Sequence, residues 1–113
     1  MERVNANELE YRYGDSGPKY LFRGPNIDWG LIRFQPGETL GAHYHDEVEE
    51  TFYFTRGAGV FKVDGVEHDI AAGDAFRVEP GETHDVLNTG DEPLDGVFIK
   101  DRYSPDDKVS AEG

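Results

Sequence analysis

Short stretches in which apolar and polar residues alternate run through most of the chain, and they predict β-strands. The clearest pattern is a hairpin, because two apolar stretches at 60–63 and 66–70 flank the turn dipeptide Asp64-Gly65. No stretch shows the period of an amphipathic helix. The remaining strands are expected at 19–23, 27–35, 40–45, 49–56, 75–78 and 94–100, with one more that begins at His84.

Turn-forming residues separate these strands at intervals of about eight to ten residues, which is typical of a β-sandwich or β-barrel. The chain of 113 residues contains 14 glycines and 6 prolines, which agrees with many short turns. A chain of this length predicts a single domain, 1–113, with a barrel core at about 19–101. Residues 103–113 lack periodicity and are expected to form a mobile tail.

Three of the four histidines lie in or near predicted strand ends. His43 and His45 are two residues apart, so in an extended segment both rings point to the same face, whereas on a helix they would diverge. A His-x-His pair is often only a solvated pair of side chains. The alternative is that the two histidines bind a metal, and the residues around the pair decide between these two interpretations.

Those surroundings contain two blocks of glycine, histidine and glutamate at fixed spacings. The first block reads Gly37, five residues, His43-x-His45, four residues, Glu50, six residues, Gly57, and the second reads Gly73, then Gly81-x-x-His84-x-x-x-Asn88. Together the two blocks resemble the paired signature of the cupin family, over residues 37–88. One difference is Glu79, with Pro80 beside it, where the second block usually has a proline.

The resemblance implies a small jelly-roll β-barrel, the double-stranded β-helix, with a metal in its bore. It also implies that Glu50 and His84 join His43 and His45 as ligands of one divalent transition metal. Three imidazoles and a carboxylate suit Mn, Fe, Ni, Zn or Cu, and the chain has no cysteine that could supply a thiolate. By alternation Phe52 and Phe54 share the face of Glu50, and Val86 shares that of His84, so these three are expected to form an apolar cavity wall.

The composition narrows the range of partners. A net charge of −13 disfavours nucleic acid as a partner, and no apolar run is long enough for a membrane span or a signal peptide. A cytoplasmic location is therefore expected. Four basic residues are candidates for a pocket, but each is expected on the surface. If two of them lined the bore, they would favour an acidic or phosphorylated small molecule as the ligand. They are Arg33, Arg56, Lys62 and Arg77.

Two functions follow from the pattern. The first is a metal-dependent enzyme, of dioxygenase or isomerase type, that acts on a small, partly apolar, oxygen-containing molecule. The second is a non-catalytic module that binds or senses such a ligand. We also expect a homodimer, because the N-terminal strands carry more aromatic residues than one small barrel can bury, namely Tyr11, Tyr13, Tyr20 and Phe22.

Overall fold

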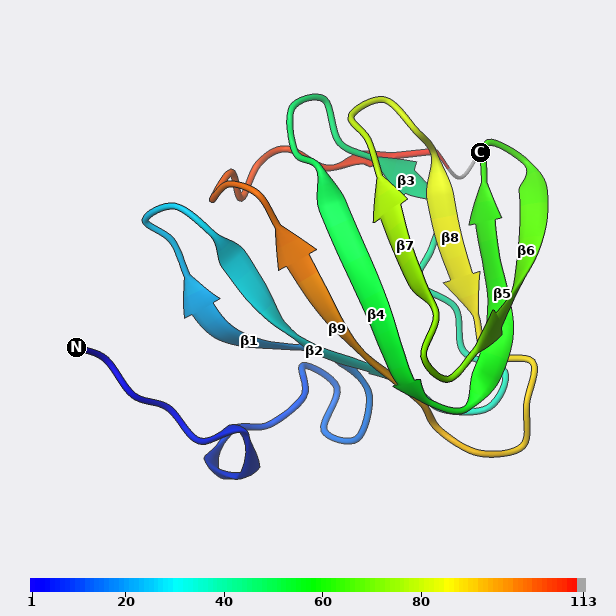
Figure 1. Ribbon diagram of the computed structural model, residues 1–113, viewed down its shortest axis with the longest axis horizontal. Helices are drawn as coiled ribbons and strands as arrows, with labels where there is room; N and C mark the ends of the chain where they lie inside the picture. Colours follow the sequence, from blue (N-terminus) through cyan, green and yellow to red (C-terminus); the bar gives the residue numbers. More distant parts are fainter. Residues whose placement is uncertain (112–113) are drawn as a thin grey trace.

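The computed structural model describes residues 1–111 and confirms the all-β prediction. Two five-stranded antiparallel sheets curl around a common core and form a small jelly-roll barrel (Figure 1). The N-terminal segment lies outside the barrel and contains one turn of 3-10 helix, η1 (Ala6–Glu8), where no helix was expected. No helix within the described residues is long and apolar enough to cross a membrane, and the cytoplasmic location stays a prediction.

The first sheet contains the longest strands, and neighbouring strands are antiparallel throughout. Residues on β4 and β9 alternate between the core and the outside, which explains the period-two pattern in the sequence. In spatial order the strands are β1 (Gly17–Arg23), β2 (Asp28–Phe34), β9 (Leu94–Lys100), β4 (Glu50–Arg56) and β7 (Ala75–Val78).

The second sheet contains the predicted hairpin, in which β5 and β6 pair on either side of Asp64-Gly65. The strand expected at 40–45 is shorter than predicted, because only two of its residues pair with a neighbouring strand. In spatial order the strands are β10 (Val109–Ser110), β3 (His43–Tyr44), β8 (His84–Leu87), β5 (Ala58–Val63) and β6 (Val66–Ala71).

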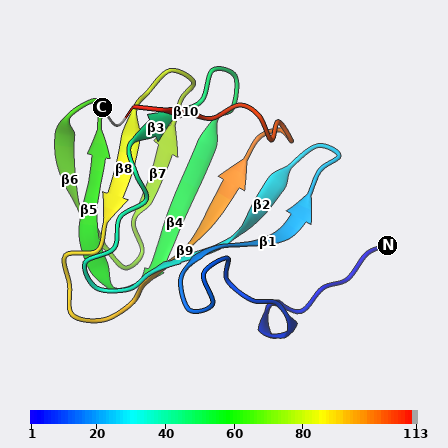
Figure 2. The ribbon, with the colours of Figure 1, turned by 180° about the vertical axis from the view of Figure 1, so that it is seen from behind.

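The C-terminal segment, which was expected to be a mobile tail, contains a short strand. Its strand β10 lies beside β3 (Figure 2). In this pair Val109 lies opposite Tyr44 and Ser110 opposite His43. Lack of periodicity did not exclude order here, because two residues paired at a sheet edge are too few to show an alternating pattern. The last two residues of the predicted tail, 112 and 113, lie outside the described residues.

The core fills one part of the barrel and leaves the metal-ligand candidates at the end where β3, β4 and β8 meet. Aromatic rings dominate it; Phe61 and Phe76, for example, stack with ring centroids 4.5 Å apart. Burial of each large apolar side chain stabilises a fold by about 1.5–3 kcal/mol. The fully buried part of the core consists of Ile32, Phe34, Phe52, Phe54, Phe61, Ile70, Val78, Val86, Leu94 and Phe98.

Candidate metal centre

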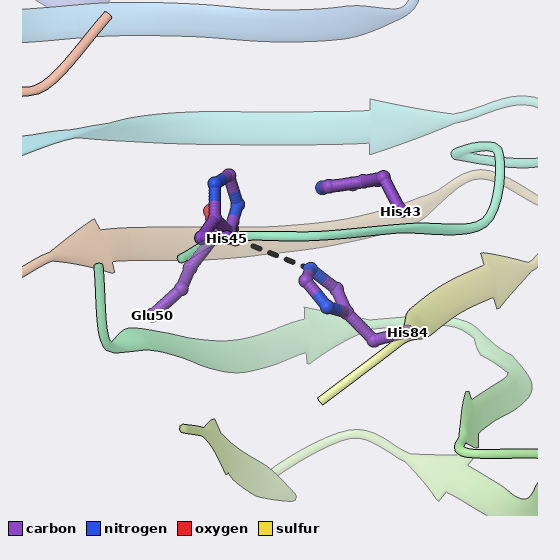
Figure 3. Close-up of side chains that lie close together, drawn as sticks. All are labelled: His43, His45, Glu50 and His84. Carbon is purple, nitrogen blue, oxygen red and sulfur yellow. Dashed lines mark hydrogen bonds and ion pairs between the residues drawn. The ribbon is translucent and has the colours of Figure 1, made fainter. Parts of the chain in front are cut away.

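The four residues at the family positions lie together inside the barrel. His43 belongs to β3, His45 follows that strand directly, Glu50 begins β4 and His84 begins β8. Their side chains point toward one another (Figure 3), and one potential ligand atom from each lies within 4.8 Å of the other three. All four are buried, with between 1% and 5% of each residue exposed.

The strand pairing explains this convergence. His43 and His84 are cross-strand partners in the antiparallel pair β3–β8, which puts their rings side by side, with centroids 4.4 Å apart. His45 lies two residues farther along and returns to the same face, and its ring lies 5.1 Å from that of His43. Strand β4, from the other sheet, brings Glu50 to the same point.

Each imidazole is oriented through its Nδ1 atom. The Nδ1 of His43 lies 2.8 Å from the carbonyl oxygen of Gly41, and that of His84 lies 3.2 Å from the carbonyl oxygen of Glu82. The Nδ1 of His45 meets the carbonyl oxygen of Asp107. Because a carbonyl oxygen only accepts, each Nδ1 donates, and in a neutral ring the lone pair is then on Nε2. This arrangement is typical of metal-binding histidines.

The Nε2 atoms of His45 and His84 meet the carboxylate of Glu50. Its Oε1 lies 3.3 Å from Nε2 of His45 and 3.4 Å from Nε2 of His84. In the part of the chain that the structure describes, His84 Nε2 is the one buried side-chain nitrogen or oxygen without a hydrogen bond. A buried polar atom in that state costs free energy unless another partner binds it. Three imidazole nitrogens and one carboxylate oxygen therefore form a donor set that fits a divalent transition metal.

The protonation states agree with this fit. Burial lowers the pKa of His43 from 6.5 to about 4. Burial by itself would raise the pKa of Glu50, but its close contacts with His45 and His84 and the charge of Lys100 lower it to about 2. Burial likewise opposes protonation of His45, but its contacts with Glu50 and the Asp107 carbonyl give it a raised pKa. At neutral pH Glu50 is therefore an anion and His43 is neutral, which are the forms that bind metals.

Asp107 holds the loop between the two ligand strands. Its Oδ1 accepts a hydrogen bond from the backbone N–H of Asp46 at 2.6 Å, and its Oδ2 accepts from those of Glu47 and Val48 at 2.8 and 3.0 Å. Burial would raise the pKa of Asp107, but these three amides hold it below its ordinary value. Asp46 and Glu47, the acidic residues of this loop, therefore lie next to the Asp107 carboxylate, and their backbone N–H groups bind it.

A cavity of about 320 Å³ opens beside the cluster, and His43, His45, Glu50 and Phe52 form part of its wall. The expected apolar wall is only partly present there. Phe54 and Val86 point inward as predicted, but they are fully buried in the core and do not line the cavity. Both side chains pack in the hydrophobic core instead, because they lie farther along β4 and β8 than the ligand residues Glu50 and His84 do.

Much of the cavity wall is polar, although an apolar wall was expected. Of the four basic candidates only Arg33 lines it, and its guanidinium is paired with Asp95 at 2.6 Å. Sequence reasoning missed Tyr20, Lys100 and Asp107, which also line the cavity. For Lys100 a signal exists, because alternation along β9 puts it on the same face as Leu94 and Phe98.

Comparison with known proteins agrees with the fold and the cluster. Residues 30–100 match the family model described as a cupin domain. The oxalate-binding protein of Thermotoga maritima is 36% identical over 68 residues, which are 60% of this chain but only 56% of that protein, so the chain spans about half the length of this relative.

Two solved structures share the fold at low sequence identity. A double-stranded β-helix protein from Klebsiella pneumoniae superposes with a TM-score of 0.83 at 19% identity, over 100% of this chain and 99% of that one. The polyketide cyclase RemF from Streptomyces resistomycificus superposes with a TM-score of 0.85 at 14% identity, over 100% and 87%.

Proposed function

The chain belongs to the cupin family, and we propose that it binds one divalent transition metal through His43, His45, Glu50 and His84 and holds a small oxygen-containing molecule beside it. The observation that carries this proposal is the orientation of the cluster. Three imidazoles each have Nδ1 against a backbone carbonyl, and one potential ligand atom from each lies within 4.8 Å of the others and of the buried carboxylate of Glu50.

The donor set suits Mn, Fe, Ni, Zn or Cu. A metal bound here would act as a Lewis acid toward an oxygen of the ligand. The protein's own part is to orient the imidazoles, to keep Glu50 ionised and to enclose the ligand in a cavity whose wall includes Phe52. Similarity to an oxalate-binding protein supports a small, oxygen-rich ligand.

The proposed function takes two forms. In the enzymatic form, the bound molecule is converted by dioxygenase- or isomerase-type chemistry. In the non-catalytic form, the chain binds or senses the molecule and releases it unchanged. Incubation of the metal-loaded protein with a bound ligand, followed by mass spectrometry of the recovered ligand, separates the two forms.

We also propose that the chain forms a homodimer through the outer face of the first sheet. This face carries apolar residues on neighbouring strands, where Tyr53 is 46% and Ile99 is 40% exposed. Leu31 and Val97 are cross-strand partners on the same face and are half-buried. A contiguous apolar sheet face supports a protein partner, and a second copy offers the same face.

Elemental analysis of protein purified without chelators tests the metal site. We expect about one equivalent of a transition metal per chain, and we expect His84→Gln to weaken its binding at least about tenfold. His68→Gln is the matched control, because His68 is exposed on β6, away from the cluster, and this variant should keep the metal. Equal metal affinity in His84→Gln and the parent would show that the ligand assignment is wrong.

A further inference from the structure

Lys100 points into the barrel next to the candidate metal centre. It is the last residue of β9, and its cross-strand partners are Glu50 on β4 and Asp28 on β2. Cross-strand partners have their side chains on the same face, so Lys100 shares the inner face with the ligand Glu50. The side chain is half-buried and lines the cavity together with His43, His45 and Glu50.

Within the described residues the ammonium group of Lys100 forms no ion pair with a carboxylate. None of the ion pairs among residues 1–111 includes Lys100. Its neighbour Asp28 is bound instead by Arg23, through two hydrogen bonds of 3.2 Å. Arg33, another cation of the cavity, is likewise paired with a carboxylate. Lys100 is therefore a cation in a sheltered cavity that makes no ion pair of its own, in a protein whose net charge is −13.

The hydroxyl group of Tyr20 lies next to the ammonium group of Lys100. Nζ of Lys100 donates a hydrogen bond of 3.0 Å to the Tyr20 hydroxyl oxygen, which leaves the hydroxyl hydrogen free to donate in turn. The Tyr20 ring is held in place by an edge-to-face contact with Phe98, at 5.0 Å, and by the Arg23 guanidinium 3.8 Å from its centre. The hydroxyl is thus a positioned donor next to the ammonium, and Tyr20 also lines the cavity.

We propose that Lys100 and Tyr20 bind a carboxylate group of the ligand, so that the ligand is a small carboxylic acid with a further oxygen donor directed at the metal. This inference rests on the proposed metal-dependent binding function and names its ligand class. A divalent metal and Glu50 together carry one net positive charge, and Lys100 adds a second. An anion that spans both positions is attracted by both charges, in a cavity where water screens them less than in bulk solvent.

The expected effect is large enough to measure. Loss of a hydrogen bond to a charged group commonly lowers affinity about tenfold to a hundredfold. The change Lys100→Met removes the ammonium but keeps an unbranched side chain, and Tyr20→Phe removes only the hydroxyl. Lys62→Met is the matched control, because Lys62 is exposed on the opposite sheet, where it is not part of the cavity.

Calorimetric titration of the metal-loaded proteins with glycolate and with glycolamide, its neutral amide, tests this inference. We expect the parent to bind glycolate more tightly than glycolamide. We expect Lys100→Met to lose at least about tenfold and Tyr20→Phe about threefold to tenfold in glycolate affinity, with glycolamide affinity and metal content unchanged. Lys62→Met should match the parent with both compounds, and Lys100→Arg should retain the preference for glycolate.

Three results would overturn the inference while the metal site stands: equal glycolate affinity in parent and Lys100→Met, equal losses for glycolate and glycolamide, or a metal-loaded parent that does not prefer glycolate. Loss of metal from Lys100→Met would also contradict it, because Lys100 would then support the ligand set itself. A parent protein that binds no metal would overturn the proposed function, and this inference with it. If Lys100→Met does not fold, Tyr20→Phe decides the question by the same criteria.

Discussion

The backbone carbonyl of Asp107 accepts a hydrogen bond from Nδ1 of His45, a residue 62 positions earlier in the chain. The same aspartate binds three consecutive backbone N–H groups of the loop that follows His45. One residue of the C-terminal segment therefore fixes both the orientation of a candidate ligand and the loop that leads to Glu50. The carbonyl contact also determines which nitrogen of His45 is left for a metal.

This relationship predicts that Asp107→Ala weakens the metal site without removing a ligand. The variant leaves three amides without their carboxylate partner, so we expect metal affinity to fall about tenfold to a hundredfold. Competition with a chromogenic chelator measures this change. Asp106→Ala is the control, since Asp106 is exposed and adjacent but makes none of these contacts, and it should match the parent. Parent-like metal affinity in Asp107→Ala would contradict the positioning role.

The buried His43 predicts a pH dependence of the metal-free protein. Its pKa is about 4 in the folded chain, below the ordinary value of 6.5. Between these values the unfolded chain binds a proton that the folded chain does not, so the contribution of His43 to the free energy of unfolding falls as pH decreases from about 7 to about 4. The raised pKa of His45 acts in the opposite sense and offsets part of this loss.

Urea unfolding of the metal-free parent and of His43→Gln, at pH 7 and pH 5, isolates the contribution of His43. We expect the parent to lose more stability than the variant on acidification, because only the parent carries the group that resists protonation. His68→Gln, at an exposed position, should follow the parent. The same loss in the parent and in His43→Gln would show that His43 does not carry this pH dependence.

Alternation in the sequence was sufficient to predict most strands and the inward direction of Phe52, Phe54 and the histidines. The same rule places Lys100 inward, on the face of Phe98, but a lysine at a strand end is usually solvated, and only the three-dimensional cavity shows that this one is sheltered. The role of Asp107 could not be predicted from the sequence. Its backbone carbonyl contacts His45 and its carboxylate binds backbone N–H groups of a loop, and neither contact produces a periodic pattern in the sequence.

Tyr20 escaped prediction for a different reason. The pairing of β1 with β2 shifts register between Tyr20 and Phe22, so a strict period of two fails there. Strand β1 also passes so close to Gly30 that a Cβ atom on this residue would lie 2.1 Å from the carbonyl oxygen of Lys19. A glycine in the sequence indicates such a close approach only after the neighbouring strand is known.

The proposed homodimer predicts that a charge on the outer face of the first sheet separates the subunits. Ile99→Glu places a carboxylate among the apolar residues of that face, so we expect light scattering at micromolar concentration to give a dimer for the parent and a monomer for the variant. Val66→Glu is the control, because Val66 is 58% exposed but lies on β6 of the other sheet. A monomeric parent, or a dimeric Ile99→Glu, would refute this interface.

The most direct test of the metal centre is an anomalous difference map from crystals of natively purified protein, with data collected on both sides of the absorption edge of the metal found by elemental analysis. The proposed function predicts one strong peak per chain, about 2.0–2.2 Å from a nitrogen of His43, His45 and His84 and from an oxygen of Glu50. A map with no peak between these four side chains, or with the metal bound elsewhere, would contradict it.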